Sequence, residues 1–88
     1  MVNNMKVIEY KNYQPYMGIL IDVRDPISAK ENPINNSTNI YHEKLLMNYK
    51  TLLDKNQKYF IICGKGKKSK EVVRILEFYG YDVTYVIN

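Results

Sequence analysis

The sequence predicts an α/β fold, with a small, mostly parallel central sheet that is flanked by helices on both faces. Two short apolar runs, residues 18–23 and 59–63, are typical of strands buried on both faces of a parallel sheet. Segments with helical spacing of apolar residues follow these runs. The chain has 88 residues, enough for one compact core, so we expect a single domain over residues 1–88.

The first half of the chain contains two candidate strands. Residues 6–8 form a short strand, and residues 10–16 form a helical turn that Pro15 ends. The apolar run that follows Gly18 is the first buried strand. Residues 32–39 are rich in Asn, Pro, Ser and Thr, so they are predicted to form a surface loop.

The second half alternates helices and strands. Residues 43–54 have an apolar stripe typical of a helix, formed by Leu45, Leu46, Tyr49, Leu52 and Leu53. A strand over 59–63 leads into a turn rich in glycine and lysine. Ser69 is a candidate cap for a helix over 69–79, and Gly80 is a candidate stop for that helix. The β-branched and aromatic residues at 82–87 predict the closing strand.

Composition excludes several classes of function. The net charge of +4 is modest for a nucleic-acid binder, and the nine tyrosines are scattered, so no nucleic-acid partner is expected. No apolar run is long enough for a membrane span or a signal peptide, so we expect no membrane partner and a cytoplasmic location. With one cysteine and one histidine, we expect no disulfide, metal or cofactor. The histidine, His42, is expected at the surface or at a helix end.

The single cysteine, Cys63, lies where a buried strand meets a tight loop and a helix. Gly64 and Gly66 allow backbone N–H groups to turn inward, and the helix that follows adds partial positive charge. Four lysines lie within residues 63–70. These features favour a thiolate and a bound anion, which together suit nucleophilic attack on an anionic, sulfur-bearing substrate. The alternative is a small buried side chain without chemistry.

The loop at residues 63–69 (CGKGKKS) resembles the active-site loop of the rhodanese family, Cys-x-x-Gly-x-Arg/Lys-Ser, between a strand and a helix. Residues 20–26 (LIDVRDP) resemble the first signature of that family. Residues 34–40 (INNSTNI) stand at the position where the family has Ile-Pro-Gly-Ala-Ile-Asn-Ile. Residues 80–86 resemble the closing strand of the family. The four motifs occur in the family's order and cover about residues 5–87.

The resemblance implies a sulfurtransferase in which Cys63 takes a sulfane sulfur from thiosulfate or a persulfide and passes it to a thiophilic acceptor. Lys68 holds the arginine position of the loop, and Arg24 is similar to a family arginine that reaches toward the substrate pocket. Asp22 is expected to anchor the loop or to pair with a base. The substrate-binding residues implied are Arg24, Gly64, Lys65, Gly66, Lys67, Lys68 and Ser69.

Three departures from the family pattern are visible. Pro33 replaces a family histidine, Lys68 replaces arginine and loses its planar fork, and the usual Trp-containing tail is absent. A non-catalytic binding module with the same fold, and a redox-sensing thiol protein, remain as alternatives. The spacing disfavours other sites: a phosphate-binding P-loop needs glycine at Ile61, a cysteine phosphatase needs arginine at Ser69, and a thioredoxin-like site needs cysteine at Gly66.

Overall fold

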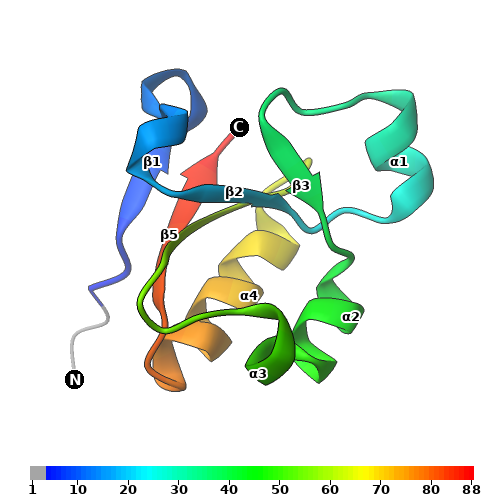
Figure 1. Cartoon of the computed structure of the whole chain (residues 1–88). Coiled ribbons are helices and arrows are strands. Elements are labelled where there is room, and N and C mark those ends of the chain that lie inside the picture. Colours follow the sequence, from blue (N-terminus) through cyan, green and yellow to red (C-terminus); the bar gives the residue numbers. More distant parts are fainter. Residues whose placement is uncertain (1–3) are drawn as a thin grey trace.

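The computed structural model describes residues 4–88 and is built on a five-stranded sheet (Figure 1). All four neighbouring strand pairs are parallel, in the order β1-β5-β4-β2-β3. The strands are β1 (Val7–Glu9), β2 (Ile19–Asp22), β3 (Ser37–Asn39), β4 (Lys58–Ile62) and β5 (Asp82–Ile87). The predicted fold class is confirmed, and the sheet is wholly parallel rather than mostly so.

The two faces of the sheet are covered differently (Figure 1). One face packs against α2 (His42–Met47), α3 (Tyr49–Leu52) and α4 (Lys67–Phe78). Val72, Val73 and Leu76 of α4 are completely or almost completely buried against this face, as the helical spacing predicts. The second face is covered by two single-turn 3-10 helices, η1 (Tyr10–Asn12) and η2 (Pro15–Met17), and by Ile34.

Two elements in the first half of the chain were not predicted. Helix α1 (Pro26–Glu31) begins at a capping aspartate, Asp25, and has no buried residue. Such a helix lacks an apolar stripe, so periodicity cannot reveal it. Strand β3 lies within the predicted surface loop, where its three polar residues pair with β2 at the edge of the sheet. The expectation of an unpaired loop over residues 32–39 is therefore wrong at residues 37–39.

Other predicted boundaries also shift. The predicted helix over 43–54 is interrupted at Asn48, whose side-chain nitrogen donates to the Lys44 carbonyl at 2.9 Å. The predicted turn over 10–16 is two 3-10 turns, and Pro15 begins the second instead of ending one. The N-terminal strand is Val7–Glu9 instead of 6–8. None of these changes alters the order of the strands.

The strand order identifies the edge at which a ligand site belongs. From β2 the chain moves outward to β3, then crosses back to place β4 on the other side of β2. In parallel α/β sheets, ligands bind beyond the carboxyl ends of the strands at such a reversal. Here the ends of β2 and β4 are Asp22 and Ile62, which are register partners. The loops that follow them are residues 23–25 and 63–66.

No helix in residues 4–88 is both long and apolar enough to cross a membrane.

Candidate active site

Cys63 directly follows β4 and is 5% exposed. Its sulfur accepts hydrogen bonds from the backbone N–H groups of Gly66 at 3.1 Å and Ser69 at 3.4 Å. The loop therefore closes around one atom. Backbone donors of this kind stabilise a negative charge on sulfur, and the amino end of α4 adds partial positive charge beside it. Of the six backbone N–H groups of residues 64–69, these two have hydrogen-bond geometry to the sulfur.

Gly66 gives the loop its shape. Its φ of +82° lies in the left-handed region, and a Cβ atom built on it would lie 2.3 Å from the hydroxyl oxygen of Tyr85. Both the backbone conformation and the space therefore require glycine at this position. The turn made here aims the Gly66 N–H at the sulfur.

Ser69 has a different role from the one predicted. Helix α4 begins at Lys67 with Gly66 as its N-cap, so Ser69 lies in the first turn of the helix and does not cap it. Its buried hydroxyl donates to the Gly66 carbonyl at 3.2 Å and accepts from the Cys63 thiol at 3.2 Å. Because a hydroxyl can turn, the same group can donate to the sulfur once the thiol loses its proton.

A pocket of about 270 Å³ opens beside the sulfur. Its walls come from the carboxyl ends of β2 and β4, the start of α4 and the residues that follow β3. The lining residues include Arg24, Tyr41, His42, Cys63, Gly64 and Lys68. The volume suits a small ligand such as an inorganic anion. Within residues 4–88, no group of three histidine, cysteine or acidic side chains could hold a metal ion.

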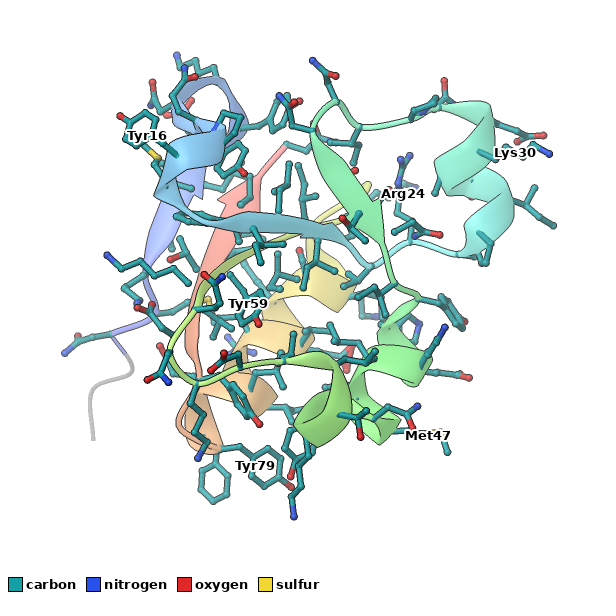
Figure 2. All side chains as sticks on the ribbon, in the orientation of Figure 1. Tyr16, Arg24, Lys30, Met47, Tyr59 and Tyr79 are labelled. Carbon is teal, nitrogen blue, oxygen red and sulfur yellow. The ribbon has the colours of Figure 1, made fainter. Side chains whose placement is uncertain are left out.

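Arg24 lines this pocket, but its guanidinium is largely engaged elsewhere. Nε and Nη2 donate to the carboxylate of Asp22 at 2.8–3.0 Å, and Nη2 also donates to the Asn32 carbonyl at 2.6 Å. Figure 2 shows Arg24 between β3 and α1. The bond to Asp22 raises the pKa of Arg24 further above its ordinary value, so the side chain stays cationic. Only Nη1 has no hydrogen-bond partner among the described residues.

The loop lysines divide between two places. Lys68 lines the sulfur pocket, where it forms a half-exposed ion pair with Glu71 at 3.5 Å. Lys65 and Lys67 instead line a separate pocket together with Gly66. The structure therefore brings together Cys63, Gly64, Lys68 and Arg24, and it does not bring Lys65 and Lys67 to the same pocket.

Four residues that line the sulfur pocket were not among the predicted site residues: Val23, Asp25, Tyr41 and His42. The rings of Tyr41 and His42 lie 4.4 Å apart. His42 is the first residue of α2, and its N–H donates to the Val23 carbonyl, so the expected helix-end position is correct. Tyr41 and His42 were missed because strand β3 was not predicted. With β3 in the sheet, residues 40–42 follow the carboxyl end of a strand, which is where ligands bind.

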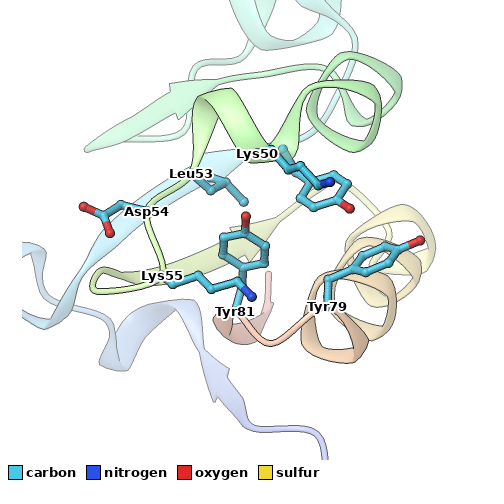
Figure 3. A pocket seen from close by; sticks show the side chains of 7 residues that line it. Lys50, Leu53, Asp54, Lys55, Tyr79 and Tyr81 are labelled. Carbon is cyan, nitrogen blue, oxygen red and sulfur yellow. The ribbon is translucent and has the colours of Figure 1, made fainter.

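A further pocket of about 800 Å³ lies at the opposite end of the strands, near the start of β5 (Figure 3). Tyr49 stacks on Tyr79 at 4.9 Å and meets Tyr81 edge-on at 5.7 Å. The ammonium of Lys55 lies 5.3 Å from the centre of the Tyr81 ring. The walls of this pocket contain neither the cysteine nor the histidine of the chain.

Comparison with known proteins agrees with this architecture. The Rhodanese-like domain family matches residues 5–88. A rhodanese-related protein from Thermoplasma volcanium is 29% identical, with a TM-score of 0.81 over 94% of this chain and 84% of that one. A rhodanese-like domain protein from Staphylococcus aureus is 26% identical, with a TM-score of 0.80 over 96% and 86%.

A single-domain sulfurtransferase from Saccharomyces cerevisiae shares the fold at 16% identity, with a TM-score of 0.73 over 100% of this chain and 87% of that one. Among curated proteins, none matches the chain significantly. The family match covers the sheet, the cysteine loop and the closing strand, and the solved structures reproduce their arrangement. The chain therefore belongs to the rhodanese-like domain family.

Proposed function

We propose that this protein is a sulfurtransferase, which moves a sulfane sulfur from thiosulfate or a persulfide to a thiophilic acceptor through a persulfide on Cys63. The observation that carries the proposal is the position of the Cys63 sulfur, held by two backbone N–H groups and facing a small pocket. Membership of a family with many sulfurtransferases supports it. We place the reaction in the cytoplasm, because a reducing compartment keeps the Cys63 thiol available for sulfur loading.

The reaction balances in two displacements. In the first, the Cys63 thiolate attacks the outer sulfur of thiosulfate, the sulfur–sulfur bond breaks, and sulfite leaves with the electron pair. In the second, the nucleophile of the acceptor attacks the outer sulfur of the persulfide. The Cys63 thiolate then leaves with the electron pair, and the acceptor becomes thiocyanate if it was cyanide, or a new persulfide if it was a thiol. The scheme needs no external oxidant or reductant.

The surrounding groups supply charge and shape. Gly66 and Ser69 stabilise the anionic sulfur through their N–H groups, and the hydroxyl of Ser69 can add a third donor. Lys68 is the lysine that lines the pocket and attracts an anionic donor to it. Arg24 holds the pocket wall, because Asp22 pairs with its charge and Asp22 and Asn32 together use most of its donors.

Intact-protein mass spectrometry after mixing with thiosulfate tests the proposal. We expect the mass to increase by one sulfur atom, and cyanide to remove that sulfur as thiocyanate. Cys63→Ser is the matched control and should show neither change, because an alcohol does not accept the sulfur. Thiocyanate production by that variant would contradict the assignment of Cys63 as the carrier.

The same experiment separates the alternatives. An unchanged mass at saturating thiosulfate and persulfide donors would indicate a binding module without sulfur transfer. An oxygen adduct on Cys63 after peroxide, without any sulfur adduct after thiosulfate, would indicate a redox-sensing thiol.

A further inference from the structure

A second pocket, of about 450 Å³, lies between the first half of α4 and β5. Its walls carry four basic side chains, which are Lys65, Lys67, Lys70 and Arg74. Three of them, at positions 67, 70 and 74, have the spacing that places residues on one face of a helix. The concentration of positive charge is therefore built by α4 itself and does not depend on loop conformation alone.

Within residues 4–88, no acidic side chain pairs with these four cations, although the ammonium of Lys70 lies 5.5 Å from the centre of the Tyr85 ring. Glu71 is the one acidic side chain in the wall, and its carboxylate lies 3.5 Å from Lys68, which faces the neighbouring sulfur pocket. A pocket lined by four basic side chains and one acidic side chain has an excess of positive charge, which favours an anionic ligand.

The hydroxyl of Tyr85 provides an independent sign of a ligand. Tyr85 is 92% buried, at 8% exposure, and its hydroxyl oxygen lies against Gly66 in the pocket wall. No described residue is within hydrogen-bond distance and geometry of this hydroxyl. Every completely buried side-chain nitrogen or oxygen in residues 4–88 has a partner. The Tyr85 hydroxyl is therefore not fully enclosed, and it meets the space of the pocket as a free donor.

We propose that this pocket binds a multiply charged anion of the phosphate class, at a site separate from the sulfur pocket. Several oxygens on one small group can meet the ammonium groups of Lys67 and Lys70, the guanidinium of Arg74 and the hydroxyl of Tyr85 together. A hydroxyl this deeply placed is reached by a small group entering a hollow and not by a flat protein surface. The proposal does not depend on sulfur transfer at Cys63.

Titration of isotope-labelled protein with inorganic pyrophosphate at low ionic strength, followed by amide NMR shifts, tests the site. We expect saturable shifts at Gly66, Lys70 and Arg74. The double variant Lys70→Ala/Arg74→Ala should bind about tenfold more weakly, because each exposed charge contributes a few-fold in affinity. The double variant Lys50→Ala/Lys55→Ala is the matched control, since it removes the same charge at the opposite end of the sheet.

Tyr85→Phe tests the hydroxyl alone. The hydroxyl has no partner in the described chain, so the variant should fold normally and bind pyrophosphate a few-fold more weakly. Comparison with adenosine diphosphate distinguishes the source of the phosphate. Equal affinity would support a free inorganic anion, and tighter binding would support the phosphate end of a larger molecule.

Three results would overturn the proposal. The first is a linear titration that never saturates. The second is an equal loss of affinity in the control variant, which would mean that net charge alone attracts the anion. The third is a peptide of several glutamates that competes as well as pyrophosphate, which would identify the surface as a docking face for an acidic protein.

Discussion

Strands β2 and β4 are neighbours and end side by side, but the charged groups at their two ends are arranged differently. At the end of β2, the carboxylate of Asp22 is 1% exposed and is held by the guanidinium of Arg24, whose side chain is 14% exposed. At the end of β4, Cys63 is also buried, at 5% exposure, but its sulfur has hydrogen bonds only with uncharged N–H groups and a hydroxyl. At the end of β2, the carboxylate and the guanidinium neutralise each other. After β4, the lysines of the loop and of α4 line the two pockets.

This difference separates a structural end from a reactive one. A buried carboxylate that already has its cation gains nothing from a visiting anion, so it fixes the shape of the wall. A sulfur surrounded by neutral donors can change its charge and its bonding without breaking an ion pair. We therefore expect substitutions at the β2 end to act mainly on stability, and substitutions at the β4 end to act mainly on sulfur loading and substrate capture.

The largest effect on stability is expected from Arg24→Ala. It leaves the Asp22 carboxylate buried without its cation, which costs about 3–5 kcal/mol of the free energy of unfolding. Urea denaturation measures this loss. Arg24→Lys keeps the charge but loses the planar guanidinium that donates several hydrogen bonds to Asp22, so we expect an intermediate loss of unfolding free energy.

Cys63→Ser is the counterpart at the β4 end and should change the unfolding free energy by about 1 kcal/mol or less. Equal losses in Arg24→Ala and Cys63→Ser would remove the distinction between the two ends.

Gly66→Ala should come next in size. The left-handed backbone and the approach to the Tyr85 hydroxyl together should cost about 2 kcal/mol and should slow sulfur loading of Cys63, because the Gly66 N–H would turn away. The double variant Gly66→Ala/Tyr85→Phe removes the contact but not the backbone strain, so it should recover part of the stability. Thermal unfolding of the four proteins in this cycle measures the recovery, and its absence would show that backbone strain accounts for the whole loss.

Lys68→Ala should have a smaller effect, confined to substrate capture. The half-exposed ammonium attracts the thiosulfate dianion from within the sulfur pocket, so we expect KM to rise about two- to fivefold with little change in kcat. Added salt should raise KM in the wild type more steeply than in the variant. Lys65→Ala is the control, because Lys65 lines the other pocket and its loss should change KM less. An equal effect would mean that both lysines reach the donor.

The smallest effect concerns Asp25, which caps α1 beyond the β2 end. Hydrogen bonds from the N–H and hydroxyl of Ser28, at 2.9 and 2.8 Å, lower the pKa of Asp25 below its ordinary 3.8. The cap therefore stabilises the fold fully above that ordinary value, and this contribution is lost as the pH falls through the lowered one. The Ser28 amide shift should move in that acidic window. Asp25→Asn keeps the cap without titration, and a shift that persists in this variant would contradict the assignment.

Sequence reasoning found what depends on patterns of burial. Most of the apolar side chains in the runs at β2, β4 and β5 and in the stripe of α4 are buried, which is why apolar spacing reveals these elements; Ile19, Ile75 and Ile87 are the exposed exceptions. Helix α1 and strand β3 bury little or nothing, so their existence depends on a cap and on pairing with β2. The polar sequences of these two elements have no apolar periodicity from which they could be predicted.

For the candidate site, the sequence identified Cys63 and its loop but could not divide the lysines. Lys65, Lys67 and Lys68 are neighbours along the chain, yet the turn at Gly66 and the start of α4 send them to different pockets. The engagement of Arg24 by Asp22 was also only partly predictable, because the Asn32 carbonyl joins the pair through the unpredicted α1. Spacing predicts proximity to the loop, and only the fold decides the direction of each side chain.

The position of β1 has a consequence for how the chain folds. In the sheet, β1 pairs with β5 alone, with Val7 in register with Tyr85. The segment that emerges early from the ribosome therefore has no strand to join until the end of the domain has been made. Closing so long a loop is entropically slow, so we expect β5 to pair with β1 and with β4 in one late folding step. Until that step, the edge of β4 that receives β5 stays open.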